Sequence, residues 1–287
     1  MFKTEISPTG RHSSNAARAI AVVGQLALGI VALLTLYPIL FILMTSFKST
    51  TDVITKPFAV TKMMLDNYAV AWKLGHVAEY FLNSAIVTVV TLIFQLVITI
   101  MAAYAFGKLR PRGHNALLLL YLTALFITIE MTTVPVFMLL KDLGLIHTRW
   151  GLILPYTASG VVMGIYIMTN FVKGLPKEVD EAAVVDGASL FQILIKIDIP
   201  LISPVIATVV IINFQHAWSE FYWALIAVKD EALKTLPLGL INFQSEYGSD
   251  YGVLAAGLMI LTIPVLIVYL YCSKYFIEGV AVGAVKG

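Results

Sequence analysis

The chain has 287 residues, of which 59% are hydrophobic and only 13% are charged, and its mean hydropathy is +0.89. A soluble domain carries about 25% charged residues, so this composition leaves too little polar surface for a water-soluble body and predicts a membrane protein. The net charge of +2 comes without a basic run, which argues against nucleic acid as a partner, and the single cysteine excludes an intrachain disulfide.

Six apolar runs are long enough to cross a bilayer, which takes about 20 helical residues. Lipid-exposed backbone must satisfy its own hydrogen bonds, so these runs predict an all-α fold of six transmembrane helices. The expected spans lie near residues 19–44, 81–106, 116–140, 151–171, 204–228 and 251–271. The first run is longer than the apolar region of a signal peptide and should remain as a span. We expect an N-terminal tail at 1–18, a transmembrane domain at 19–275 and a C-terminal tail at 276–287.

The second loop sets the expected orientation. It carries Lys108, Arg110 and Arg112 without any acid, and short loops rich in Lys and Arg stay in the cytoplasm. Both termini and the second and fourth loops should therefore be cytoplasmic in a multi-pass protein of the cell membrane. The first loop, at about 46–80, should then be external, either as a small cap that contacts an outside partner or as a plain connector.

The fourth loop, at about 173–203, predicts two short helices. Pro176 followed by acids is typical of a helix start, and Gly187 is typical of a helix end. A second helix should span about 189–195, and Pro200 should separate it from the fifth span. Helices of two or three turns are unstable alone in water, so this loop needs a surface to pack on.

The first of these helices has the composition of a docking element. Ala182 and Ala183 keep one face slim enough for a partner's backbone to approach, and Glu181 places a carboxylate beside them. We interpret the loop as a knob for a groove in another protein. An ordinary re-entrant or interfacial loop is the alternative.

The spacing in this loop resembles the EAA loop of ABC importer permeases. Glu181-Ala182-Ala183, three residues, Gly187, nine residues, Ile197, one residue and Ile199-Pro200 match that pattern, with Ile199 standing where Leu is usual. In that family the loop seats in a cleft of an ATP-hydrolysing subunit. The resemblance therefore implies that the residues coupling the chain to the ATPase are Glu181, Ala182, Ala183, Asp186, Gly187, Ile197 and Pro200.

More of the chain resembles the maltose-type carbohydrate permeases. The matching segments are Tyr80-Phe81-Leu82-Asn83-Ser84, Trp218-Ser219-Glu220-Phe221 and the C-terminal Gly283-Ala284-Val285-Lys286-Gly287. The resemblance implies a permease subunit that imports carbohydrate by alternating access and is not itself an enzyme. Its implied partners are a second permease subunit, two ATPase subunits and an extracytoplasmic sugar-binding protein. The chain contains no G-x-x-x-x-G-K-[ST] loop, so it should carry no cofactor of its own and leave ATP to its partners.

Polar residues inside the expected spans suggest a substrate pathway. Glu130 and Glu220 would be costly in lipid, so they should face a cavity or a partner. Asn213, His216 and Glu220 share one helical face at i, i+3 and i+7, next to aromatic residues that suit sugar rings. The pathway candidates are Glu130, Asn213, His216, Trp218, Glu220 and Tyr222. For Asn213 and Gln215 the alternative is interhelical hydrogen bonding.

Two other classes of protein remain as alternatives. A secondary transporter or channel would use Glu130, His216 and Glu220 as a proton relay, but it leaves the EAA spacing unexplained. A membrane-embedded enzyme would use His216 and Glu220, but there is no H-E-x-x-H run and no metal site is expected. The identity of the cargo stays open among oligosaccharides, sugar alcohols and glycerol phosphate.

Overall fold

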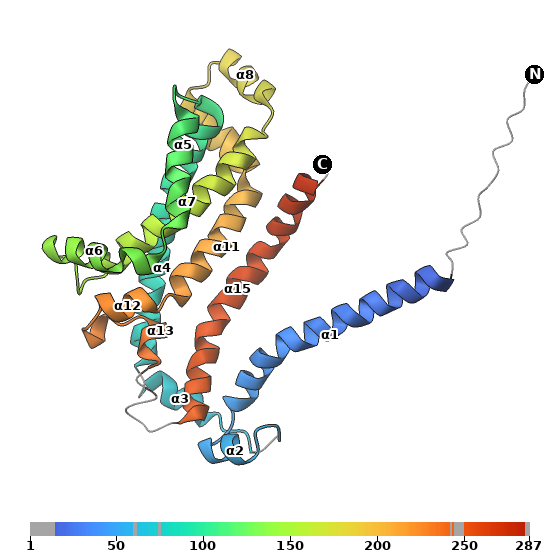
Figure 1. The fold of residues 1–287 in the computed structure, drawn as a ribbon, viewed down its shortest axis with the longest axis vertical. Coiled ribbons are helices and arrows are strands. Elements are labelled where there is room, and N and C mark those ends of the chain that lie inside the picture. The colour runs from blue at the N-terminus through green and yellow to red at the C-terminus, as the bar shows by residue number, and fades with distance from the viewer. Residues whose placement is uncertain (1–14, 60–61, 74–75, 242, 244–249, 285–287) are drawn as a thin grey trace, which may run out of the picture.

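The computed structural model describes residues 15–59, 62–73, 76–241, 243 and 250–284, and within them the regular elements are helices (Figure 1). Among these residues, four helical segments are long and apolar enough to cross a membrane, and two bent helix pairs raise the number of candidate spans to as many as six. The all-α prediction is confirmed, and the predicted six spans match the upper count.

Long helices form the body of the molecule and short ones form its ends and side projections. The long helices are α1 (Asn15–Thr45), α4 (Val77–Tyr104), α7 (Trp150–Lys173), α11 (Ser203–Ser219) and α15 (Tyr251–Ala284). The shorter α-helices are α2 (Thr50–Thr55), α3 (Asp66–Lys73), α5 (His114–Leu122), α6 (Ile129–Asp142), α8 (Lys177–Val185), α9 (Leu190–Ile193), α10 (Ile199–Leu201), α12 (Tyr222–Ala227) and α13 (Leu236–Gly239). Two π-helical segments, η1 (Ala105–Leu109) and η3 (Leu194–Asp198), and two 3₁₀ segments, η2 (Thr123–Phe126) and η4 (Glu231–Leu233), join them.

The core of the molecule is the packing of α4, α7 and α11, with α15 against α11. Gly160 and Gly164 of α7 form a small-x-x-x-small pair that permits this close approach. A Cβ atom on Gly160 would lie 2.1 Å from Nε2 of Gln95, and one on Gly164 would lie 3.0 Å from the side chain of Thr99. Gln95 is buried and donates from Nε2 to the carbonyl of Tyr156 at 2.7 Å.

The predicted third span is broken rather than straight. Helices 114–126 and 129–142 meet at an angle of 99°. The break lies at Ile127 and Thr128, whose backbones are extended, whereas Pro135 lies inside α6. Thr128 is a residue type that favours a helix start, and it provides the N-cap position of α6.

The predicted fifth span also differs from the structure. Helix α11 ends at Ser219, so the expectation of one helix over 204–228 is wrong at its C-terminal end. Glu220 is extended, with φ −67° and ψ 130°, and the chain turns into the separate helix α12. On the other side, α11 is preceded by the helical segment 190–201 at a bend of 75°.

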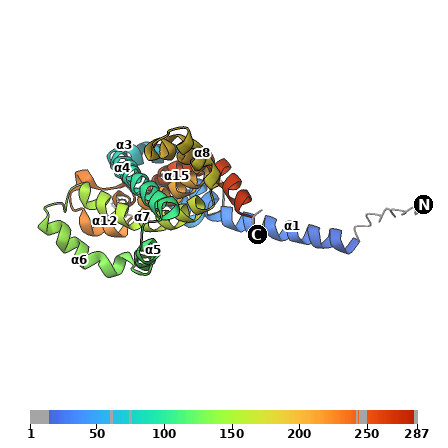
Figure 2. The same ribbon diagram turned by 90° about the horizontal axis from the view of Figure 1, so that it is seen from above.

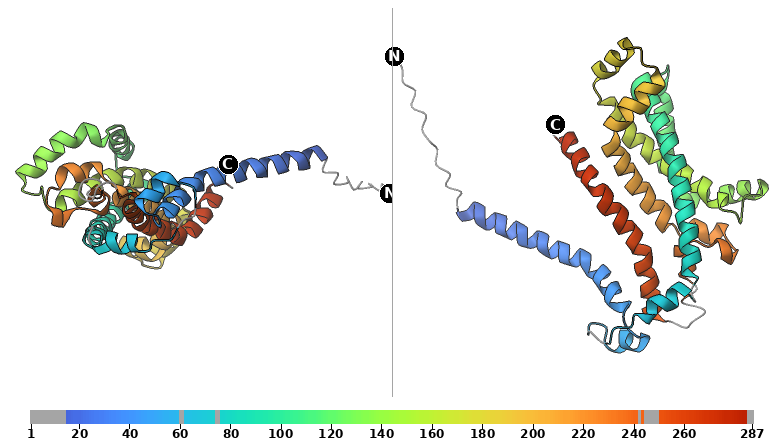
Figure 3. Two further views of the ribbon diagram at one scale, coloured as in Figure 1. Left: turned by 90° about the horizontal axis from the view of Figure 1, so that it is seen from below. Right: turned by 180° about the vertical axis from the view of Figure 1, so that it is seen from behind.

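The short helices mark two opposite ends of the molecule. Helix α8 lies at one end, and α2 and α3 lie at the other, close to the start of α15 (Figures 1 and 3). The α2–α3 segment is fastened there by Asn67, which donates to the carbonyls of Ser46 and Lys48 at 2.9 Å each. A Cβ atom on Gly252 of α15 would lie only 2.2 Å from the Lys48 carbonyl oxygen, so this segment packs directly on α15.

Helix α1 stands away from the rest of the molecule along most of its length (Figures 1 and 2). Its residues from Ile20 to Leu40 are exposed, although the segment is strongly apolar. At the other terminus α15 continues to Ala284, so residues 276–284 of the predicted C-terminal tail are helical. Residues 1–14 and 285–287 of the two predicted tails lie outside the described residues.

Candidate functional site

The first of the two short helices predicted in the fourth loop is present as α8, and its docking role stays a prediction. Pro176 is the residue immediately before the helix, with φ −62° and ψ 131°, rather than a member of its first turn. Glu178 and Asp180 lie in the first turn, where carboxylates favourably meet the unpaired backbone N–H groups. The sequence therefore predicts the start of α8 to within one residue.

Gly187 ends α8 in the predicted way. Its φ of +83° is in the left-handed region, which costs glycine little. The Gly187 N–H donates to the Val184 carbonyl and the Ala188 N–H donates to the Ala183 carbonyl, each at 3.0 Å. This pair of hydrogen bonds is a Schellman motif, which satisfies carbonyls that the helix end would otherwise leave unpaired.

The open face of α8 differs from the predicted one at a single residue. Glu181, Ala182, Asp186 and Gly187 are exposed, whereas Ala183 is buried within the chain. The exposed part of the predicted slim face is therefore made by Ala182 alone. The large apolar side chains of α8 and α9 that are exposed are Val179, Val184, Val185, Leu190 and Phe191.

The second short helix of the loop is also present. Ser189 and Gln192 form a reciprocal capping box, in which each side chain accepts a hydrogen bond from the other residue's backbone N–H. Helix α9 leads directly into η3 and α10, so the helical segment is longer than the predicted 189–195. Ile197 is half-buried in η3, and Pro200 is exposed in α10 next to the bend before α11.

Sequence reasoning missed one cluster in this region. Lys108 of η1, the segment that continues α4, contacts Asp180 of α8 and Asp198 of η3. The signal in the sequence is the carboxylate of Asp198 within the apolar stretch before Pro200, which calls for a buried cation. The sequence does not indicate which basic residue pairs with Asp198, because Lys108 lies 72 residues before Asp180 and 90 residues before Asp198.

Two of the predicted pathway residues are packed inside the chain. Trp218 is 2% exposed, stacks on Phe214 with ring centroids 5.6 Å apart, and donates from Nε1 to the Leu261 carbonyl at 2.9 Å. Asn213 is buried beside Gly160 of α7, and its Nδ2 atom has no hydrogen-bond partner in the described part of the chain. Their role in a substrate pathway stays a prediction, and the structure gives both residues a packing role.

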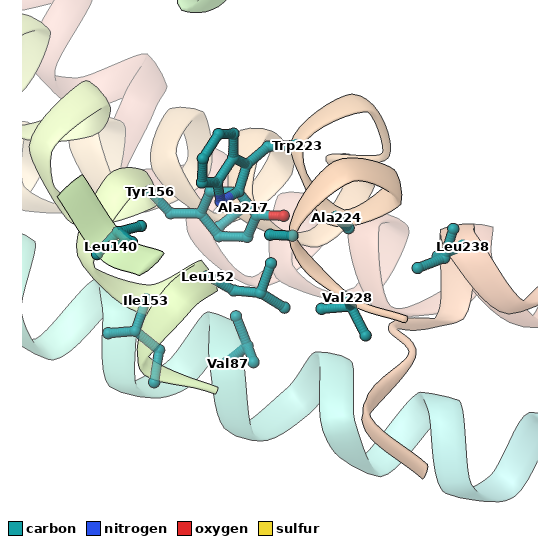
Figure 4. Close-up of a cluster of buried hydrophobic side chains, with 11 residues drawn as sticks. Val87, Leu140, Leu152, Ile153, Tyr156, Ala217, Trp223, Ala224, Val228 and Leu238 are labelled. Carbon is teal, nitrogen blue, oxygen red and sulfur yellow. The ribbon is translucent and has the colours of Figure 1, made fainter. Parts of the chain in front are cut away.

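The carboxylate of Glu220 caps the first turn of helix α12. Its carboxylate accepts hydrogen bonds from the backbone N–H groups of Trp223 at 2.7 Å and Ala224 at 3.2 Å, and from the hydroxyl of Tyr156. Trp223 is buried and donates from Nε1 to the Gly151 carbonyl at 2.8 Å. Figure 4 shows Tyr156 and Trp223 within the apolar cluster that fastens α12 to α7 and α4. These bonds account for a carboxylate at this position without a substrate.

The remaining pathway candidates are exposed and are not members of this cluster. Glu130 is in the first turn of α6, His216 is on the open side of α11, and Tyr222 opens α12. Asn213 and His216 differ in burial, and Glu220 lies beyond the end of α11. The predicted single polar face is therefore not formed within this chain.

The segment Tyr80–Ser84, noted above for its resemblance, holds the loop that follows α12. Asn83 donates from Nδ2 to the carbonyls of Ala232 and Lys234 at 2.8 and 3.1 Å and accepts a hydrogen bond from Arg149. The Ser84 hydroxyl accepts from the Leu236 N–H at 2.8 Å. This end of α4 thus positions the connection between the fifth and sixth spans. Within the described residues no group of three or more His, Cys, Asp or Glu could hold a metal ion.

The fold and this loop define a class of protein: a multi-pass membrane component with a short capped helix protruding between two of its spans. The model of the family described as binding-protein-dependent transport system inner membrane component matches residues 16–273. The chain belongs to this family of ABC transporter permeases, which are transport components rather than enzymes.

Curated relatives support this assignment, and their sequence similarity to the chain extends over most of their length. A probable ABC transporter permease protein, YurM of Bacillus subtilis, is 36% identical over 88% of this chain and 84% of its own. The arabinooligosaccharides transport system permease protein AraQ of Halalkalibacterium halodurans is 31% identical over 90% and 93%. The diacetylchitobiose uptake system permease protein NgcG of Streptomyces coelicolor is 31% identical over 96% and 92%.

Solved structures share the fold. A chain in the crystal structure of a bacterial ABC transporter that imports the acidic polysaccharide alginate superposes with a TM-score of 0.79 at 26% identity, covering 93% of this chain and 100% of that one. A chain from the alginate transporter in complex with an alginate-pentasaccharide-bound periplasmic protein gives a TM-score of 0.66 at 16% identity, over 92% and 96%. The second likeness supports the fold alone.

Proposed function

We propose that this chain is one permease half of a carbohydrate importer, and that α8 is the element through which partner ATPase subunits drive it. The observation that carries the proposal is the form of α8: a short helix closed at Gly187, protruding at one end of the molecule, with Glu181 and Ala182 on its open side. Such a helix is too short to be stable without further contacts, so a second surface must complete it.

The chemistry of the open face fits a groove in a protein. The slim side at Ala182 admits close approach of a backbone, the exposed Val185 and Phe191 supply apolar area, and Glu181 supplies a charge for a basic partner residue. Asp186, Gly187, Ile197 and Pro200 maintain the two helix ends and the bend between the loop and α11. In this proposal α8 faces the cytoplasm, and the α2–α3 segment at the opposite end faces outward.

The assembly contains a second permease chain, two ATPase subunits and an extracytoplasmic binding protein. Exposure of α1 along its length supports the second permease chain, because an apolar helix that contacts little of its own chain has area available for a neighbour. ATP-driven closure of the ATPase subunits moves α8, and the spans change a central cavity from outward to inward access. A carbohydrate cargo is supported by relatives that transport arabinooligosaccharides and diacetylchitobiose.

The substrate pathway in this proposal runs along the exposed candidates. His216, Tyr222 and Glu130 have side chains open to a cavity or to the second permease chain, whereas Trp218, Asn213 and Glu220 support them from within. Replacing His216 with Asn should lower uptake or change the range of sugars carried. Unchanged uptake of every sugar tested would remove His216 from the pathway.

Reversal of charge at Glu181 tests the proposal as a whole. If Glu181 pairs with a base in a partly buried groove, Glu181→Lys costs about 3–5 kcal/mol, which lowers the affinity for the ATPase subunits by about 100-fold or more. Membrane insertion should be unaffected, because Glu181 is exposed and makes no hydrogen bond or ion pair with the described residues that the lysine would break. Glu178→Lys, an equal charge reversal on the same helix but off the EAA pattern, is the matched control.

Co-purification of the ATPase subunits and ATP-dependent uptake into proteoliposomes are the measurements. Loss of both in Glu181→Lys, with a smaller effect in Glu178→Lys, supports the proposal. Normal ATPase binding and uptake in Glu181→Lys would refute it. Uptake that persists without ATP and stops with an uncoupler would instead indicate a secondary transporter.

A further inference from the structure

Three charged side chains from distant parts of the sequence meet where α8 joins the membrane helices. Lys108 Nζ lies 2.6 Å from Asp180 Oδ1 and also contacts Oδ1 of Asp198. The Lys108 side chain is 12% exposed, that of Asp180 23% and that of Asp198 only 1%. The cluster therefore has a fully buried half and a partly exposed half, and the exposed half belongs to α8.

The backbone holds Lys108 and Asp198 firmly in place. Lys108 lies in the π-helical segment η1 and Asp198 in the π-helical segment η3, two of the wide turns that often occur at functional sites. Beside Lys108, Gly107 packs so closely on α7 that a Cβ atom would lie 2.6 Å from Cγ1 of Val172. The lysine is thus fixed to the ends of α4 and α7.

The charges of the cluster do not balance. One lysine faces two carboxylates, and Oδ2 of Asp198 has no hydrogen-bond partner in the described part of the chain. The buried contact with Asp198 is difficult to open, because it would leave a carboxylate unpaired at low dielectric. Asp180 can exchange Lys108 for water more easily. Lys108 and Asp198 therefore move as one unit when α8 pulls on them through Asp180.

Asp180 is also the point where α8 is fastened. Among the hydrogen bonds and ion pairs of the described residues, its bonds with Lys108 are the ones that join an α8 side chain to the membrane helices. A force applied to α8 reaches α4 directly through Lys108, and reaches the segment before α11 through Asp198. The end of α4, which is distant from α8 in the sequence, would then respond together with the segment before α11.

We propose that Lys108 is a positioning residue for transport, which transmits displacement of α8 to α4 and α11 through Asp180 and Asp198. This inference rests on the proposed function, since it requires that an ATPase subunit acts on α8. It adds a side-chain route to the covalent links of α8 through Gly174–Pro176 and Asp186–Ser189, and it assigns the weaker contact of the cluster to Asp180.

The test uses the full complex of this chain with its second permease, ATPase subunits and binding protein, reconstituted in proteoliposomes. Asp180→Asn is the principal variant, because it weakens the α8 contact and leaves Lys108 paired with Asp198. Glu178→Gln makes the same chemical change at an exposed position of the same helix and serves as the control. Lys108→Met and Lys108→Arg remove and retain the charge at the centre of the cluster.

The readouts are ATPase co-purification and the ratio of ATP hydrolysis with and without the binding protein. We expect Asp180→Asn and Lys108→Met to retain the ATPase subunits but lose stimulation by the binding protein, and Lys108→Arg to recover part of it. Glu178→Gln should behave as the unaltered chain. Full stimulation in Asp180→Asn would overturn the proposal, as would loss of ATPase binding in that variant, since the cluster would then only shape α8.

These outcomes are distinct from failure of the proposed function. If Glu181→Lys leaves ATPase binding intact, then α8 is not the docking element and the proposed function fails. If Glu181→Lys abolishes binding while Asp180→Asn keeps full stimulation, then only the role assigned to Lys108 fails.

Discussion

The left-handed backbone at Gly187 predicts that different substitutions there weaken the proposed docking of α8 to different degrees. A Cβ atom added at this residue would meet nothing within 4 Å, so a substitution is resisted by backbone conformation alone and not by crowding within the chain. At φ +83° an L-residue costs about 1–2 kcal/mol relative to its right-handed conformation. This cost opposes the two hydrogen bonds that close α8.

This conformational free-energy cost should lower the affinity of the ATPase subunits for α8. If the ATPase groove accepts only the closed helix end, its apparent affinity falls with the population of that conformation. A penalty of about 1–2 kcal/mol corresponds to a reduction of up to about 5- to 30-fold. Gly187→Ala should show this reduction and Gly187→Val a larger one, since a branched side chain tolerates this conformation least. Gly187→Asn should remain nearest to the unaltered chain, because Asn adopts it most readily.

The comparison of Gly187→Asn with Gly187→Val distinguishes a conformational cost from a clash with the partner, because the two side chains are similar in size. Titration of the ATPase subunits onto the permease in detergent, with transport in proteoliposomes as a second assay, provides the measurement. An order of Asn, Ala and Val from mildest to most severe supports a conformational cost. Equal loss in Asn and Val, with Ala unaffected, would refute the reasoning and indicate a clash with the partner instead.

Other predictions concern the bundle. Glu220→Gln should reduce thermal stability in detergent less than Glu220→Ala. The amide oxygen of Gln can still accept a hydrogen bond from the first backbone N–H groups of α12 or from the Tyr156 hydroxyl. Equal loss of stability in the two variants would contradict the capping role of Glu220. Gly160→Ala should lower stability by about 1–3 kcal/mol, because the new methyl group displaces the buried Gln95 amide from its hydrogen bond. Gly29→Ala, at an open position of α1, is the matched control, and equal melting temperatures in the two variants would count against close packing at Gly160.

Much of the fold could be predicted because long apolar runs have few structural solutions in lipid. The spans over α1, α4, α7 and α15 follow from hydropathy alone, and the loop between α7 and α11 follows from Pro176, Gly187 and Ser189, whose backbone preferences act locally. The breaks at Ile127 and Glu220 could not be predicted in this way. Neither contains Pro or Gly, and both depend on how the chain packs on α7.

The candidate site was predictable to a similar degree. The residues of the EAA pattern are adjacent in the sequence, so their spacing could be recognised before the structure was known. The burial of Ala183 and the ion pairs of Lys108 arise from elements far apart in the chain, and no local pattern indicates them. The pathway was least predictable, because helical periodicity placed Asn213 and His216 on one face whereas neighbouring helices cover only Asn213.

The π-helical segment at Lys108 gives chain length an unusual importance at this point. A π-turn contains one residue more than the α-helical turn that it replaces. Because the wide turn absorbs one residue, deleting a single residue from 105–107 would let the segment close as regular α-helix, and the side chains beyond the deletion would keep roughly their orientation around the axis. A further one-residue insertion has no such turn to absorb it and would rotate the following side chains, Lys108 among them, by about 100°. An insertion here should therefore be more damaging than a deletion of the same size, because it moves the lysine away from its two carboxylates.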